Sequence, residues 1–161
     1  AVDLLKGIAV GAGMDCALVE GANGGLHTNY EGKAAAAVEA LTRGGYDFAY
    51  IHVEAPDEMG HQGQTKDKIQ AIENVDQRVL RPVVEGLREA GEDFRLLVLP
   101  DHPTPIEART HTAEAVPYLI YDSTAPVEGQ KVYNEKTAAR TGRNWPEGYQ
   151  LMRHFLQEEL C

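Results

Sequence analysis

The sequence is poor in cysteine, in long apolar runs and in targeting signals, and each absence excludes a class of protein. Its two cysteines, Cys16 and Cys161, lie far apart and belong to no C-x-x-C pair, so neither a disulfide framework nor a thiolate zinc site is expected. No apolar stretch approaches the roughly 18 residues that span a membrane, and we expect no signal peptide. We therefore expect a reduced, cytoplasmic setting and no membrane partner.

Basic residues are also scarce. The 161 residues include 15 Lys and Arg against 25 Asp and Glu, which gives a formal net charge of −10. Because a nucleic-acid surface neutralises phosphates with clustered basic side chains, and no such cluster occurs here, no nucleic-acid partner is expected. An acidic chain can still bind an anionic substrate where a metal ion or local basic side chains reverse the field in one pocket.

The composition that is present is typical of one globular domain. A hydrophobic content of 43% with 25% charged residues is ordinary for a folded protein. A chain of this length can bury a core without disulfides, so we expect residues 1–161 to form a single domain. The chain begins AVDLLKGIAV, without Met and inside an apolar periodic segment, which indicates a portion of a longer protein. Processing or deliberate truncation would produce the same start.

Helix-like and strand-like segments alternate along the chain. Since the central strand segments are apolar throughout, the alternation predicts an α/β sandwich, with a parallel or mixed sheet covered on both faces. Helical patterns cover residues 2–12, 33–45, 66–90 and 146–160, and strand patterns cover residues 15–20, 47–53, 94–100 and 116–122.

Two of the helical segments carry local signals. Thr28 and Asn29 precede residues 33–45, and both are good N-cap types. In residues 66–90 apolar side chains recur at spacings of three and four, which predicts one apolar stripe, and Pro82 should kink or split the helix. The stripe consists of Ile69, Ile72, Val75, Val79, Val83 and Leu87.

Polar residues collect where predicted strands end or begin. In open α/β sheets, ligands bind beyond the carboxyl ends of the strands, and three loops of this chain carry carboxylate and imidazole side chains there. Carboxylate oxygen with imidazole nitrogen suits Mn²⁺, Zn²⁺ or Mg²⁺. Five ligands exceed one tetrahedral site and leave room for two ions, as in phosphoryl displacement. The candidate ligands are Asp57, His61, Asp101, His102 and His111.

Each of these motifs also has a purely structural interpretation. The D-x-x-x-H segment from Asp57 to His61 lies in a predicted loop, where it could be a polar turn with a surface histidine. The adjacent Asp101 and His102 could form a helix N-cap or a loop hydrogen bond. The conjunction of all five residues at strand ends favours metal binding, although composition and spacing alone leave both interpretations open.

The ordered set of motifs resembles a known family. HVEAPDEMGHQG, LPDHPTPIEARTHT, VPYLIYD and TNYEGKAAAAVEAL are similar to the C-terminal part of the archaeal-type cofactor-independent phosphoglycerate mutases, which belong to the alkaline phosphatase superfamily. The resemblance covers the chain from VDLLKGI to the final helix. It implies part of an alkaline-phosphatase-like three-layer sandwich, with a mostly parallel sheet and helices on both faces. Some bacterial members carry the label of homoserine kinase.

The resemblance also implies a metal-dependent reaction. Members of the family use two divalent ions, usually Mn²⁺, Mg²⁺ or Zn²⁺, and interconvert 3-phosphoglycerate and 2-phosphoglycerate through a phosphoserine in glycolysis and gluconeogenesis. Matched by motif, Asp57, His61 and His111 would bind one ion. Asp101 and His102 would contribute to the site of the second ion. The implied partner is this small phosphorylated metabolite.

Several parts of the family's machinery have no counterpart in this sequence. No segment resembles the N-terminal metal aspartate, the nucleophilic serine or the inserted domain that supplies arginines. The only serine, Ser123, lies past the strand pattern of residues 116–122, so no catalytic residue is assigned. Arg109, two residues before His111, is a candidate for contacting a substrate phosphate, and a solvated loop arginine is the alternative. We expect an isolated fragment that lacks mutase activity and whose apolar surface could favour a homo-oligomer.

Three functions stay open at this point. The chain could be part of a phosphoglycerate mutase, or part of a related phosphatase or phosphotransferase such as a homoserine kinase. It could also be a non-catalytic metal-binding module. A serine nucleophile elsewhere in a longer chain would separate the enzymes from the binding module.

Overall fold

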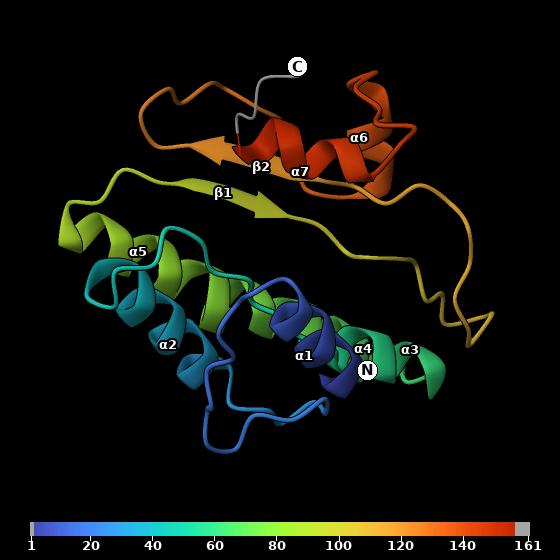
Figure 1. Ribbon diagram of the computed structural model, residues 1–161. Helices are drawn as coiled ribbons and strands as arrows, with labels where there is room; N and C mark the ends of the chain where they lie inside the picture. The colour runs from blue at the N-terminus through green and yellow to red at the C-terminus, as the bar shows by residue number, and fades with distance from the viewer. Residues whose placement is uncertain (1, 157–161) are drawn as a thin grey trace. The chain divides into compact units, whose positions relative to one another are not determined.

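The structure, a computed structural model, describes residues 2–156, which fall into two compact units. The first unit contains the described residues up to Glu92 together with Thr104–His111. The second contains Asp93–Pro103 and the described residues from Thr112 onward. Figure 1 shows helices in both units, and none in the described range is long and apolar enough to cross a membrane. The expectation of a single domain stays a prediction.

The first unit is helical. The helical patterns predicted at residues 2–12, 33–45 and 66–90 are confirmed, and one further helix forms between them. The elements are α1 (Val2–Gly11), α2 (Tyr30–Thr42), α3 (Ala55–His61), α4 (Thr65–Val75), a π-helical turn η1 (Asp76–Leu80) and α5 (Arg81–Ala90).

A polar cap and a buried aromatic ring fix the start of α2. The predicted cap is confirmed at Asn29, whose Oδ1 accepts a hydrogen bond from the Gly32 N–H at 2.8 Å. Tyr30 follows and is fully buried, with the guanidinium of Arg78 stacked 4.8 Å from the centre of its ring. Arg78 Nε also donates to Glu31 Oε1 at 2.5 Å, and this ion pair lowers the pKa of the Glu31 carboxyl. These contacts attach α2 to η1.

The kink predicted at Pro82 takes the form of a π-helical turn. The Arg81 N–H donates to Asp76 O, five residues back, and Pro82, which has no N–H to donate, follows in the first turn of α5. A π turn inserts one residue into the helix, which rotates α5 by about 100° relative to its orientation in an uninterrupted α-helix.

The inserted residue breaks the predicted apolar stripe. Ile69 and Ile72 are 53% and 52% exposed, whereas Ala71 is fully buried. Beyond the turn the predicted stripe is confirmed, since Val83 and Leu87 are buried. The rotation brings Ala71, rather than Ile72, into line with the buried face of α5. A strict α-helical period could not reveal this shift.

The segment expected as a loop after residues 47–53 is instead the short helix α3, so the loop prediction was wrong. Pro56 lies in its first turn, where proline is favoured, and Asp57 with Glu58 places negative charge near the positive end of the helix dipole. Ala55 and Met59 are buried, and α3 packs against α4. The glycines around residue 60 suggested a turn, but burial of this apolar face favours the helix.

The strands predicted at residues 15–20 and 47–53 are not formed in the described structure. Residues 47–53 keep the side-chain alternation of an extended chain, since the rings of Tyr50 and His52 stack with their planes 7° apart. Their connection to α2 is a side-chain contact, in which Lys33 Nζ donates to His52 O at 2.8 Å. Burial of this ammonium lowers its pKa. A strand needs backbone pairing with a neighbour, which the pattern of side chains alone does not supply.

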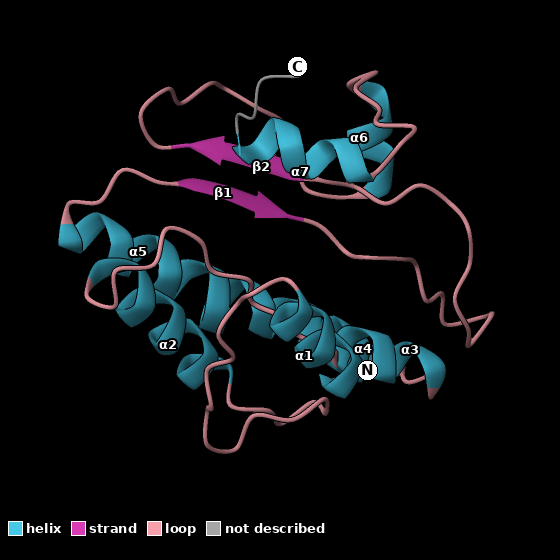
Figure 2. Ribbon diagram, viewed as in Figure 1, coloured by secondary structure: helices cyan, strands magenta, loops and turns pink. Residues whose placement is uncertain are grey.

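The second unit contains both strands of the described structure. β1 (Arg95–Val98) and β2 (Leu119–Asp122) fall within the predicted strands 94–100 and 116–122. They pair antiparallel, with Arg95 opposite Asp122, whereas a mostly parallel sheet was expected (Figure 2). Two helices come after them, α6 (Glu135–Arg140) and α7 (Tyr149–Leu156). The predicted last helix is confirmed over α7, and residues 157–160 lie outside the described residues.

The cap of α2 makes a first testable prediction. Replacing Asn29 by Ala removes the acceptor for the Gly32 N–H and the donor to Glu20 O, and we expect the free energy of unfolding to fall by about 1–2 kcal/mol. Chemical denaturation followed by circular dichroism measures the change. Asn29→Ser, which keeps a capping oxygen, should recover part of the loss. Equal stability of Asn29→Ala and the parent chain would contradict the capping role.

Asp122 makes a second prediction, on the pH dependence of stability. Its carboxylate accepts hydrogen bonds from Thr124 and from Arg95 Nε, which lower the pKa of Asp122 to about 2. Because the folded pKa lies below the ordinary value of 3.8, the stabilisation is fully present above pH 4 and is lost as the pH falls towards 2.

Asp122→Asn should therefore lower the unfolding midpoint at pH 7, and the difference from the parent chain should shrink between pH 4 and pH 2. Denaturant unfolding of both proteins across this range measures it. Asp93→Asn, at an exposed position in the same unit, is the matched control and should change little at either pH. A difference for Asp122→Asn that is constant with pH would overturn the assignment.

Candidate metal centre

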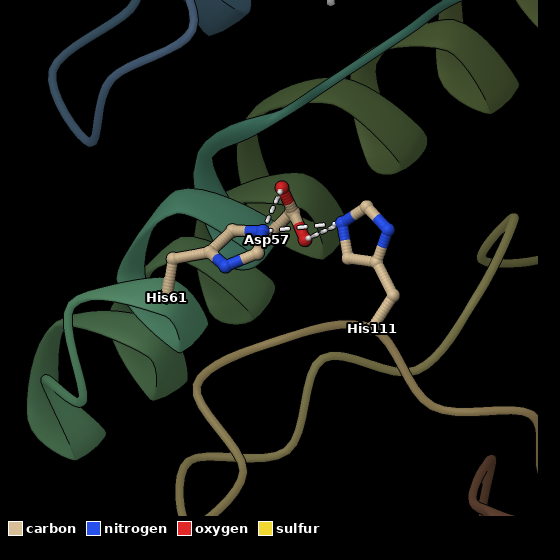
Figure 3. Close-up of side chains that lie close together, drawn as sticks. All are labelled: Asp57, His61 and His111. Atoms are coloured by element: carbon tan, nitrogen blue, oxygen red, sulfur yellow. Dashed lines mark hydrogen bonds and ion pairs between the residues drawn. The ribbon is translucent and has the colours of Figure 1, made fainter.

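Three of the five predicted ligands meet in the first unit. Asp57 and His61 lie four residues apart on α3, a spacing that places both side chains on one face of the helix. His111 reaches them from the segment Thr104–His111 (Figure 3). The Nε2 atoms of the two histidines are 3.1 Å apart. Asp57 Oδ2 lies 3.4 Å from His61 Nε2, and Asp57 Oδ1 lies 3.5 Å from His111 Nε2.

The orientation of His61 is fixed by the backbone of the facing loop. His61 Nδ1 lies 3.0 Å from the carbonyl oxygen of Arg109, which can only accept, so Nδ1 carries the proton. In the neutral ring, Nε2 then presents its lone pair to Asp57 and His111. Lone pairs and a carboxylate that converge at this distance repel one another unless a proton or a cation lies between them. The arrangement therefore favours a positively charged occupant.

The separations fit a divalent metal ion. A tetrahedral ion with bonds of about 2.0–2.2 Å holds its ligand atoms roughly 3.3–3.6 Å apart, and an octahedral ion with similar bonds holds them at about 3.0 Å. The observed distances of 3.1, 3.4 and 3.5 Å span these two geometries. Two imidazoles and one carboxylate are a set typical of catalytic sites with an open coordination position. The three side chains are 29–52% exposed, so small molecules can reach them.

Asp101 and His102, the other two predicted ligands, belong to the second unit. His102 Nε2 lies 3.4 Å from Asp101 Oδ2, and the His102 backbone N–H donates to Asp101 Oδ1 at 3.1 Å. The pair therefore forms the local loop contact that sequence reasoning offered as its structural alternative, and its carboxylate and imidazole stay adjacent. Its participation in a second metal site stays a prediction.

Arg109, predicted to contact a substrate phosphate, has a backbone role that sequence reasoning missed. Its φ of 52° lies in the left-handed region, which turns its carbonyl oxygen towards His61. The guanidinium lies against Gly63, where an added Cβ would be 2.6 Å from Arg109 Nε. A main-chain acceptor leaves no signal in residue type, so the sequence could not have revealed it. The phosphate contact stays a prediction.

Comparison with known proteins shows the class of protein to which this fold belongs. A family model described as Metalloenzyme superfamily matches residues 1–153, and the chain belongs to this superfamily. The solved structure of the PH0037 protein from Pyrococcus horikoshii superposes with a TM-score of 0.76 at 33% identity, covering 87% of this chain and 41% of that chain. These matches confirm the expected α/β, alkaline-phosphatase-like fold class.

Curated relatives carry the name that the motifs suggested. The 2,3-bisphosphoglycerate-independent phosphoglycerate mutase of Methanothrix thermoacetophila is 48% identical over 153 residues, which are 95% of this chain and 38% of that protein. The protein of the same name from Methanosarcina acetivorans is 50% identical over 139 residues, 85% of this chain and 34% of that protein. The family resemblance is thereby confirmed, and the chain spans less than two fifths of the length of these relatives.

The triad makes a third prediction. Replacing Asp57 by Ala removes the only carboxylate of the set, and we expect the affinity for Mn²⁺ or Zn²⁺ to fall by more than about 100-fold, beyond the loss typical of an outer-shell contact. Isothermal titration calorimetry of the purified chain measures it. Glu58→Ala, which removes the neighbouring carboxylate on the same helix, is the control and should bind like the parent chain. Unchanged binding by Asp57→Ala would exclude this site.

Proposed function

We propose that this chain is the metal-binding part of a cofactor-independent phosphoglycerate mutase, which interconverts 3-phosphoglycerate and 2-phosphoglycerate in cytoplasmic glycolysis and gluconeogenesis. The observation that carries the proposal is the convergence of Asp57, His61 and His111, in a chain whose relatives of 48% and 50% identity bear that name. The Metalloenzyme superfamily match supports the use of divalent metal ions.

Asp57, His61 and His111 would hold one ion through one carboxylate oxygen and two imidazole nitrogens. We assign Asp101 and His102 to a second ion, with further ligands from the remainder of the full-length protein. A divalent ion, when bound, supplies positive charge that stabilises the phosphoryl oxygens during transfer. The part of this chain is to hold the ligands in place and to leave the site open to a small phosphorylated acid.

The chain itself does not supply the nucleophile in this proposal. Its single serine, Ser123, has a structural contact instead, since its Oγ accepts a hydrogen bond from the Phe94 N–H at 2.8 Å. The Ser123 N–H in turn donates to Phe94 O at 3.0 Å, which extends the pairing of β1 and β2. We therefore assign the phosphorylated serine and the arginines that bind substrate to the larger part of the relatives that this chain does not match. The isolated chain should bind metal without mutase activity.

Two alternatives keep the same metal site. A related phosphatase or phosphotransferase, such as a homoserine kinase, would use identical ligands with a different substrate pocket. A non-catalytic metal-binding module would use them without turnover. The names of the relatives favour the mutase over both.

A chimeric enzyme tests the proposal, as a fourth prediction. The matched 153-residue segment of the Methanothrix thermoacetophila mutase is replaced by residues of this chain. With Mn²⁺ present, we expect the chimera to convert 3-phosphoglycerate to 2-phosphoglycerate, measured by coupling to enolase. The same chimera carrying Asp57→Ala should lose the activity, and the chain alone should show none.

The controls separate the alternatives. Circular dichroism and metal content establish that each chimera is folded and loaded. A folded, loaded chimera that hydrolyses other phosphate esters but not phosphoglycerate would favour the related phosphatase. One that binds metal and turns over no phosphorylated compound would favour the binding module.

A further inference from the structure

A buried threonine lies beside the candidate metal centre. Thr104 is only 4% exposed, and its hydroxyl donates a hydrogen bond to Asp57 Oδ1. It begins the segment that also carries Arg109 and His111, so one stretch of chain supplies a ligand, a carbonyl contact to His61 and a hydroxyl contact to Asp57. A threonine at such a position has one of two roles. It either fills space in the core and forms the hydrogen bond incidentally, or it orients the Asp57 carboxylate.

The position of Thr104 is fixed from two sides. Lys68 Nζ, on α4, donates to the carbonyl oxygen of Thr104 at 2.6 Å. On α3, Gly60 allows the loop to approach, because a Cβ added there would lie 2.6 Å from Thr104 O and 2.9 Å from its Cγ2. The threonine is therefore held against the same helix that bears Asp57 and His61, and its hydroxyl has little freedom to follow a moving carboxylate.

We infer that Thr104 is a positioning residue that fixes the Asp57 carboxylate for metal binding, an inference that rests on the metal site of the proposed function. The hydroxyl binds Oδ1, which also faces His111 Nε2 at 3.5 Å, while Oδ2 faces His61 Nε2 at 3.4 Å. A hydrogen bond to an ionised acceptor is stronger than one between neutral groups, so the hydroxyl resists rotation of the carboxylate.

Both candidate ligands of α3 are oriented by a hydrogen bond with the facing segment. The Arg109 carbonyl orients His61 through Nδ1, and the Thr104 hydroxyl orients Asp57 through Oδ1. Outer contacts of this kind fix the rotamer of a ligand before metal arrives, and their removal typically lowers metal affinity about 10- to 100-fold. Thr104 does not itself lie among the ligand atoms, so its effect on the ion passes through Asp57.

Cobalt binding to the purified chain tests this inference. Thr104→Val keeps the shape of the side chain and removes the hydroxyl, and Thr104→Ser keeps the hydroxyl. We expect Thr104→Val to weaken Co²⁺ binding by about 10- to 100-fold and to alter the visible absorption of the bound ion, because Asp57 can then rotate. Thr104→Ser should restore both affinity and spectrum. Thr110→Val, an exposed threonine of the same segment, is the matched control and should behave like the parent chain.

The outcomes separate this inference from the proposed function. If the parent chain binds Co²⁺ and Asp57→Ala abolishes binding, but Thr104→Val shows the parent affinity and spectrum, the role of Thr104 is overturned while the metal site stands. If Asp57→Ala leaves binding unchanged, the metal site falls and this inference falls with it. Should Thr104→Val fail to fold, as judged by circular dichroism, Thr104→Ala replaces it in the same comparison with Thr104→Ser.

Discussion

The site depends on the close contact between α3 and the segment Thr104–His111. Residues separated by about 50 positions in sequence meet only because this segment lies against the helix at Gly60, where no side chain intervenes. The contact places the His111 imidazole opposite His61 and sets two backbone carbonyls and a hydroxyl in fixed positions. The convergence of the three side chains is a result of this packing, since His111 could not reach Asp57 and His61 from an extended chain.

Residue type predicted much of the candidate site, because metal chemistry restricts the choice of ligand. Asp57, His61 and His111 were identified as carboxylate and imidazole groups at the ends of segments, and the structure brings these three together. The supporting contacts could not be predicted in this way. Thr104 and Lys68 are ordinary residues in the sequence, and the Arg109 contact uses a carbonyl oxygen that every residue possesses.

The fold was predictable where local signals decide it. The cap at Asn29, the interruption near Pro82 and the two apolar strands of the second unit each arise from side-chain preferences within a few residues. Prediction failed where distant contacts decide. Residues 47–53 have the composition of a strand without pairing as one. The helix α3 forms although Gly60 lies within it, because its apolar side packs on α4. Strand direction likewise depends on which neighbour pairs, and the antiparallel ladder could not be read from either strand alone.

The π-helical turn at Asp76–Leu80 makes the length of this helical segment critical. The extra residue of the turn aligns the buried face of α4 with the buried face of α5. Removing one residue there would rotate α5 by about 100° relative to α4, so the two buried faces would no longer align. Val83 and Leu87 would then turn away from their buried positions, while Arg78 would lose its alignment with Tyr30 and Glu31. Deleting a single residue from the turn would thus change the direction of every side chain of α5.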